Sequence, residues 1–144
     1  MLSVVLDTNV VLDCWVFDDP DARRLKDALQ SGRLVAVRSA ATDAELEDVL
    51  GRAQFGLAPA ARSTLLDEWR DRAALAAVDS PAAIRCADPA DQKFLDLALA
   101  ARVHALFTKD KALLATAARA RAHGLRIVLP KTAESMLLFE DDLP

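Results

Sequence analysis

The chain opens on Leu2-Ser3-Val4-Val5-Leu6-Asp7, an apolar run that passes directly into an acidic residue. A short apolar run that contains β-branched residues predicts a buried β-strand. No turn residue separates this strand from Asp7, so the acid stands at the carboxyl end of the strand. The elements that follow decide whether other polar residues reach the same end.

Strand and helix patterns alternate along the rest of the chain. Asp19-Pro20 and Asp88-Pro89 each begin a helix, with Asp as the N-cap and Pro at the first helical position. Further strands are expected at residues 34–37, 75–78, 104–107 and 126–129, and helices at 19–32, 40–50, 59–74, 88–99, 111–123 and 132–139. This alternation predicts an α/β fold: one domain over residues 1–144, with a parallel sheet covered by helices on both faces in a Rossmann-like, three-layer arrangement.

Composition limits the classes of partner. Hydrophobic residues make up 53% of the 144 residues and charged residues 28%, which is typical of one globular domain. The formal net charge of -4 does not attract polyanions by itself, so RNA binding would need local attraction or bound cations.

The two cysteines, Cys14 and Cys86, exclude a disulfide framework and a zinc knuckle. We expect both to be buried thiols in a reducing compartment. The chain shows no basic leader and no apolar run near the roughly 20 residues that span a bilayer. A cytoplasmic location without membrane association is therefore expected.

Four acids stand where a parallel sheet would bring them together. Asp7 and Asp110 each follow a predicted strand, and ligands of such sheets bind at the carboxyl ends of the strands. Asp91 and Glu45 lie early in predicted helices. Taken singly, Asp110 is explained as a helix cap, Asp91 by the helix dipole and Glu45 as a solvated acid.

Together these acids would repel one another unless a cation lay between them. Mg²⁺ or Mn²⁺ fits, because both prefer carboxylate oxygens and bridge to phosphate. Such an ion activates water and stabilises an in-line phosphoryl displacement. His104 and His123 are far in sequence from any nucleophile, so no Ser-His-Asp grouping competes with this interpretation.

Four stretches of the sequence resemble, in order, the motifs of the PIN-domain family, and in particular its branch of toxin components of toxin–antitoxin modules. The stretches are residues 4–10, residues 44–50 with Arg52 and Phe55, residues 88–98 and residues 108–114. The resemblance implies a PIN-like fold and a divalent-metal-dependent endoribonuclease. It also implies an RNA substrate and a cognate antitoxin protein.

By this resemblance, the metal ligands and catalytic residues are Asp7, Glu45, Asp91 and Asp110. Thr8 and Asn9 would orient Asp7 and nearby water, and Thr108 would support Asp110. Lys109 stands where the family often has glycine or arginine, and Ala112 stands where it often has a further acid. The second departure favours one metal ion over two.

Asp96 is left out of the site, because five residues beyond Asp91 correspond to a rotation of about 140° on a helix. Basic residues near the motifs are candidates for phosphate contact, and each could equally be a solvated surface residue. They are Arg52, Lys93, Lys109 and Lys111.

Aromatic residues make up only 5% of the chain and tyrosine is absent, so an extended platform for stacking bases is not expected. A narrow acidic site suits single-stranded or loop RNA better than a stiff duplex. Apolar residues at 65–69 and 136–139 are candidates for contact with an inhibitor or for a homodimer. Packing in the core is the alternative for both segments, and we favour it for Trp69.

Three alternatives remain at this point. A phosphatase of the haloacid dehalogenase type also begins with a strand that ends in Asp, but it typically needs a second Asp where this chain has Asn9. A receiver domain needs an acid after a central strand, where this chain has Arg38-Ser39. A non-catalytic PIN-like binding module would share the whole pattern.

Overall fold

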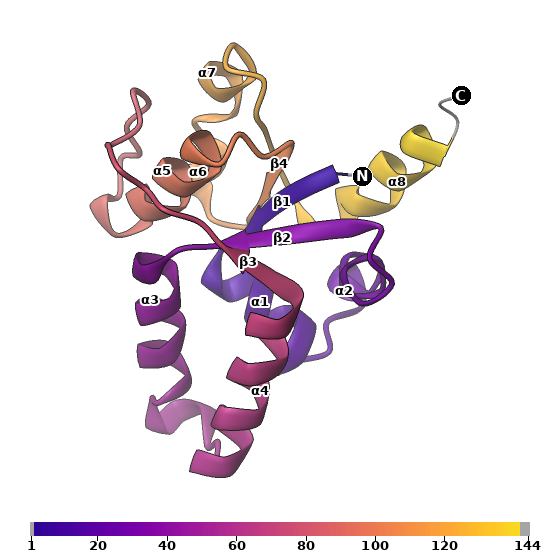
Figure 1. Ribbon diagram of the computed structural model, residues 1–144, viewed down its shortest axis with the longest axis vertical. Helices are drawn as coiled ribbons and strands as arrows, with labels where there is room; N and C mark the ends of the chain where they lie inside the picture. The colour runs from indigo at the N-terminus through magenta and orange to yellow at the C-terminus, as the bar shows by residue number, and fades with distance from the viewer. Residues whose placement is uncertain (1, 142–144) are drawn as a thin grey trace.

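The computed structural model describes residues 2–141, with side chains described as far as Leu138. Within these residues the chain forms a five-stranded sheet in the order β3-β2-β1-β4-β5, and every pairing is parallel (Figure 1). The strands are β1 (Leu2–Leu6), β2 (Leu34–Arg38), β3 (Ala73–Leu75), β4 (Ala105–Phe107) and β5 (Arg126–Val128). The strand order changes direction beside β1, because β2 and β3 extend to one side of it and β4 and β5 to the other.

Helices pack on both faces of this sheet (Figure 1). The side chains of Val4 and Leu6 belong to one core cluster, and Val5 between them belongs to the other. The first cluster includes α1 (Thr8–Trp15), α2 (Arg23–Gln30), α3 (Ala40–Leu50), α4 (Pro59–Arg72) and α8 (Ala133–Asp141), and the second includes α5 (Gln92–Ala100), α6 (Lys111–Leu114) and α7 (Ala117–Arg121). The predicted three-layer α/β fold is confirmed.

The two Asp-Pro starts are also confirmed. Asp19 and Asp88 are N-caps whose side chains accept hydrogen bonds from Asp21 N and Ala90 N, both at 2.9 Å. Each start forms a short 3-10 turn, Pro20–Ala22 or Pro89–Asp91, before the α-helix continues. Gly32 follows α2 with a φ of 81°, a left-handed conformation that glycine adopts without steric cost.

Helix α1 was not predicted. Six of its eight residues are buried, so its sequence lacks the apolar stripe that reveals a helix lying on a surface. Its start depends on Asp7, whose Oδ1 accepts a hydrogen bond from Val10 N at 2.9 Å. This bond satisfies one of the amide groups that are left without a partner at a helix start.

The strand expected at residues 75–78 was placed too late. Helix α4 ends at Arg72, and β3 occupies Ala73–Leu75 because it pairs with Ala36, Val37 and Arg38 of β2. Strand β2 ends at Arg38, so the chain beyond β3 has no strand to pair with. It continues as an irregular segment that reaches the start of α5.

The helix expected at residues 111–123 is divided into α6 and α7. Thr116 lies between them, and its hydroxyl donates to Leu113 O at 2.7 Å while its amide donates to the same carbonyl at 3.0 Å. A threonine side chain that binds a nearby backbone carbonyl competes with continuous helical bonding. The hydroxyl therefore accounts for the break.

Residues proposed as partner surfaces pack mainly in the core. Leu65, Trp69, Met136 and Leu137 are buried, Leu138 is exposed, and the side chain of Phe139 lies outside the described residues. The two cysteines are buried and free, as expected. None of the helices within residues 2–141 has the length and apolar character that a membrane-spanning helix needs.

Candidate active site

Two acids follow strands β1 and β4, at the point where the strand order of the sheet changes direction. Asp7 follows β1, is 4% exposed, and binds Phe107 O of β4 through its amide at 3.1 Å. Asp110 follows β4 and caps α6, where its Oδ1 accepts from Ala112 N at 2.8 Å and from Leu113 N at 3.3 Å. Crevices at such a change of direction are where open α/β sheets bind ligands.

One threonine hydroxyl connects these two acids. Thr108 is fully buried, and its hydroxyl donates to Asp7 Oδ2 while accepting from Asp110 N at 2.9 Å. Resemblance assigned Thr108 to Asp110 alone. In the structure it holds the Asp110 backbone and the Asp7 carboxylate together.

Asp91 approaches the same edge from the Pro89–Asp91 turn. Its Oδ2 is buried and has no hydrogen-bond partner among the described residues. Burial raises the pKa of Asp91 to about 6, and the negative charges of Asp110, Asp88 and Asp7 and a side-chain contact with the Asp110 carboxyl act in the same direction. An unpartnered buried carboxylate oxygen is costly, and a bound cation would relieve that cost.

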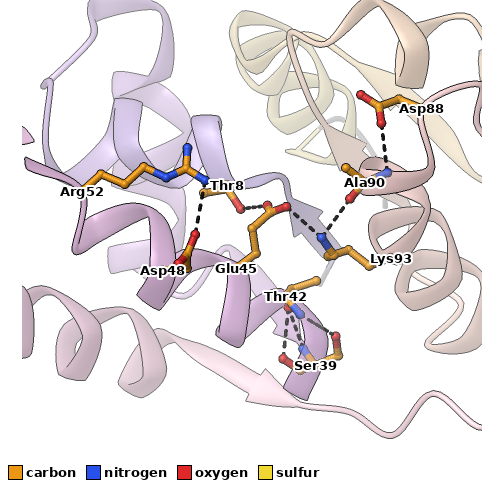
Figure 2. A network of polar contacts seen from close by, with 9 residues as sticks. All are labelled: Thr8, Ser39, Thr42, Glu45, Asp48, Arg52, Asp88, Ala90 and Lys93. Atoms are coloured by element: carbon orange, nitrogen blue, oxygen red, sulfur yellow. Dashed lines mark hydrogen bonds and ion pairs between the residues drawn. The ribbon is translucent and has the colours of Figure 1, made fainter. Parts of the chain in front are cut away.

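Glu45 extends from α3 towards α1 and α5, and both of its oxygens have partners (Figure 2). Oε2 accepts the hydroxyl hydrogen of Thr8, and Oε1 accepts from Lys93 Nζ at 2.8 Å. Thr8 was expected to orient Asp7, but its hydroxyl binds Glu45. Asn9, the other expected orienting residue, is exposed on α1.

The predicted basic residues fall into two groups. Lys93 and Lys109 contact acids at the site, since Lys93 binds Glu45 and Lys109 Nζ lies 2.5 Å from Asp13 Oδ2. Arg52 instead pairs with Asp48 at 3.2 Å on the exposed side of α3 (Figure 2), and Lys111 is exposed at the start of α6.

Asp13 is an acid that the sequence analysis did not select. It lies on α1, is 5% exposed, and raises the pKa of Lys109 above its ordinary value through their hydrogen bond. Lys109 Nζ also lies 4.0 Å from Asp19 Oδ2. An acid inside an apolar run is a signal of function that the sequence offered, but the partner of Asp13 lies in a loop 96 residues later.

Burial dominates the electrostatics of Asp7. It raises the pKa of Asp7 from 3.8 to about 6; the hydrogen bonds from Thr108 and Val10 lower it, and the charges of Asp110 and Asp13 raise it. His104 takes no part, since its Nδ1 accepts from Ser3 N at 3.0 Å at the opposite end of β1.

No group of three or more His, Cys, Asp or Glu side chains within residues 2–138 has an arrangement that could hold a metal ion. The carboxylates of Glu45 and Asp7 bind groups of the protein itself: Glu45 binds Thr8 and Lys93, and Asp7 binds Thr108 and Val10. The donor set still fits a hard divalent cation, since it consists of carboxylate oxygens and includes the unpartnered Asp91 Oδ2.

A family model described as PIN domain matches residues 3–112, which include all four acids. The chain belongs to the PIN-domain family. Proteins with this domain are generally nucleases and typically use divalent metals. No curated protein matches the chain.

In this PIN domain, Asp7→Asn should stabilise the metal-free protein at pH 7, and the gain should shrink as the pH falls. The folded pKa of about 6 lies above 3.8, so ionised Asp7 destabilises the fold above pH 6 and this penalty disappears below pH 3.8. This pKa shift corresponds to an upper limit of about 3 kcal/mol on the gain in the free energy of unfolding. Asparagine retains the N-cap. Guanidinium unfolding in EDTA between pH 4 and pH 8 measures the difference.

Asp67→Asn, at an exposed position on α4, is the matched control and should change stability by less than about 0.5 kcal/mol. A wild type that is more stable than Asp7→Asn at pH 7 would contradict the assignment. A difference that does not vary with pH would do the same.

Proposed function

We propose that this PIN-domain protein is a divalent-metal-dependent endoribonuclease that cleaves single-stranded or loop RNA. The observation that supports it most directly is the shared Thr108 hydroxyl, which joins Asp7 and Asp110 beside the unpartnered Asp91 Oδ2. Three acids from distant parts of the chain thus reach one sheet edge. The costs of burying Asp7 and Asp91 show in their raised pKa values.

In this proposal Asp7, Asp91 and Asp110 hold Mg²⁺ or Mn²⁺, with Glu45 as a further ligand. The ion, when bound, supplies charge for the phosphodiester and lowers the pKa of a water molecule. Thr108 keeps Asp7 and Asp110 at a fixed separation, and Thr8 orients Glu45. Lys109 ties the loop that contains Asp110 to Asp13 of α1.

Lys93 has two roles in this scheme. Without a metal ion it neutralises Glu45, and with substrate it contacts a phosphate oxygen. Its ammonium group competes with a cation for the same carboxylate. Arg52 and Lys111 remain candidates for more distant phosphate contacts.

Single-stranded RNA is favoured by charge and composition. The net charge of -4 and the few basic residues near the site provide little attraction for a duplex. A flexible strand can bring one phosphodiester to the acids without bringing the rest of its charge.

We also propose that the protein is the toxin of a toxin–antitoxin pair, that it acts in the cytoplasm, and that a cognate antitoxin inhibits it. The support is the resemblance of four successive motifs to that branch of the family, together with the harm that an uncontrolled ribonuclease causes. A homodimer is part of this proposal, and light scattering that shows a strict monomer would count against it.

Asp7→Asn and Asp91→Asn should each reduce Mn²⁺-dependent cleavage of single-stranded RNA by at least about 100-fold, because each removes a charge that balances the metal and the transition state. Circular dichroism should show an unchanged fold. Asp67→Asn serves as the control and should retain activity. Wild-type cleavage by Asp7→Asn would rule out this site.

Lys93→Met should bind Mn²⁺ more tightly and cleave RNA more slowly. Removing one positive charge at Glu45 is worth about 1 kcal/mol or more, or at least about fivefold in affinity, while the lost phosphate contact lowers the rate. Electron paramagnetic resonance of free Mn²⁺ measures the affinity without any substrate. Arg52→Met removes a charge paired on the exposed side of α3 and should leave Mn²⁺ affinity within about twofold. Unchanged affinity in Lys93→Met would argue against competition.

Expression of the wild-type chain in bacteria should arrest growth, whereas Asp7→Asn at the same level should not. Co-expression of the protein encoded by the neighbouring gene should restore growth and shift the elution of the purified chain. Normal growth at high levels of active wild-type enzyme would refute the toxin role while leaving the ribonuclease proposal in place.

A further inference from the structure

A pocket of about 310 Å³ lies next to the acids but outside them. Four alanines line it together with Ser39, Val78 and two charged residues. Ala40, Ala41, Ala76, Ala77, Lys93 and Asp96 line it, and we refer to it as the alanine pocket. The metal scheme above does not use this space.

The alanine pocket opens at the same edge of the sheet as Asp7. Strands β2 and β3 end at Arg38 and Leu75, and the pocket is formed by the residues that come just after them. The segment after β3 runs past the start of α3 towards α5 (Figure 1). A ligand bound at the acids can therefore extend into the pocket along the carboxyl ends of the strands.

Lys93 links the pocket to the acids. Its side chain lines the pocket, and Figure 2 shows its ammonium group between Glu45 and Ala90. Its ammonium group has three donors, and among the described residues the structure assigns two of them, to Glu45 Oε1 and to Ala90 O, both at 2.8 Å. The third donor is available to a phosphate at the mouth of the pocket.

Asp96, which also lines the alanine pocket, provides a hydrogen-bond acceptor. Its Oδ1 accepts from Ala82 N at 2.8 Å and from Gln92 Nε2 at 3.0 Å, and these bonds fix the carboxylate against α5. Both bonds use Oδ1. Within residues 2–138 no hydrogen bond to the second oxygen is found, so this oxygen can accept from a donor group of a ligand.

We propose that the alanine pocket binds the nucleobase next to the scissile phosphate of a single-stranded RNA. Small side chains leave room for a flat ring, Asp96 accepts from an amino or imino group on its edge, and Lys93 contacts the adjoining phosphate. This assignment rests on the proposed ribonuclease function. It adds that the enzyme selects its cleavage position through a base with hydrogen-bond donors.

Ala77→Leu fills the pocket without altering an acid or Lys93. It should lower kcat/KM for a single-stranded hexaribonucleotide of mixed sequence by about tenfold, since it removes the contacts of one base. Hydrolysis of bis(4-nitrophenyl) phosphate, a diester without a nucleobase, should stay within about twofold of wild type. Ala74→Leu changes an exposed alanine outside the pocket and is the matched control, and Ala41→Leu tests the opposite wall.

Equal cleavage of the hexaribonucleotide by Ala77→Leu and Ala74→Leu would overturn the proposal, as would equal losses on both substrates. Fluorescence anisotropy of the same labelled strand in Ca²⁺ tests the pocket separately from the chemistry. Weaker binding by Ala77→Leu and Ala41→Leu than by Ala74→Leu supports the base site even if wild type cleaves neither substrate. Equal binding by all three variants, or no binding by wild type, refutes it.

Discussion

The burial of the Asp7 carboxylate beside Asp110 and Asp91 is the constraint on which the site depends. Burial, together with the negative charges of Asp110 and Asp13, disfavours its ionised form and raises its pKa to about 6. The fold accommodates the group through two hydrogen bonds, from Val10 N at the start of α1 and from the Thr108 hydroxyl. These bonds also fix where α1 begins and where β4 ends and the loop before α6 starts. The hydrogen bonds that stabilise the buried carboxylate therefore also shape the crevice around it.

Lysine side chains balance two further acids near the site, Glu45 and Asp13, from within the protein. Lys93 binds Glu45, and Lys109 binds Asp13, so neither ammonium group is simply a solvated surface charge. Each pair joins separate elements, which places the balancing charges on α5 and on the loop after β4. Such an arrangement keeps acids close together in the absence of a cation, and under the proposed function a cation or a phosphate would compete for the same groups.

The parallel topology explains why the acids and the alanine pocket share one edge. Every strand runs in the same direction, so the residues that follow β1, β2, β3 and β4 lie at the edge formed by the carboxyl ends of the strands. Acids follow β1 and β4 beside the change of strand order, whereas small residues follow β2 and β3. Chemistry and base selection, as proposed, would then occupy adjacent halves of one edge. In this proposal the attraction for RNA would be local, because the whole chain carries a net charge of -4.

The sequence by itself determined the α/β class, the acid that directly follows the first strand and both Asp-Pro helix starts, because periodicity and capping are local properties. The resemblance of four stretches to PIN-domain motifs also marked the four acids as candidates for the site. Only the tertiary structure decided that α1 is a helix, since its nearly complete burial hides any periodic stripe. It alone showed that Thr8 serves Glu45, that Thr108 serves both Asp7 and Asp110, and that Lys109 finds Asp13. Thr8 and Glu45 lie 37 residues apart and Thr108 and Asp7 lie 101 residues apart, and the parallel pairing of β1 with both β2 and β4 brings the ends of these strands together. No pattern within a single segment contains that information.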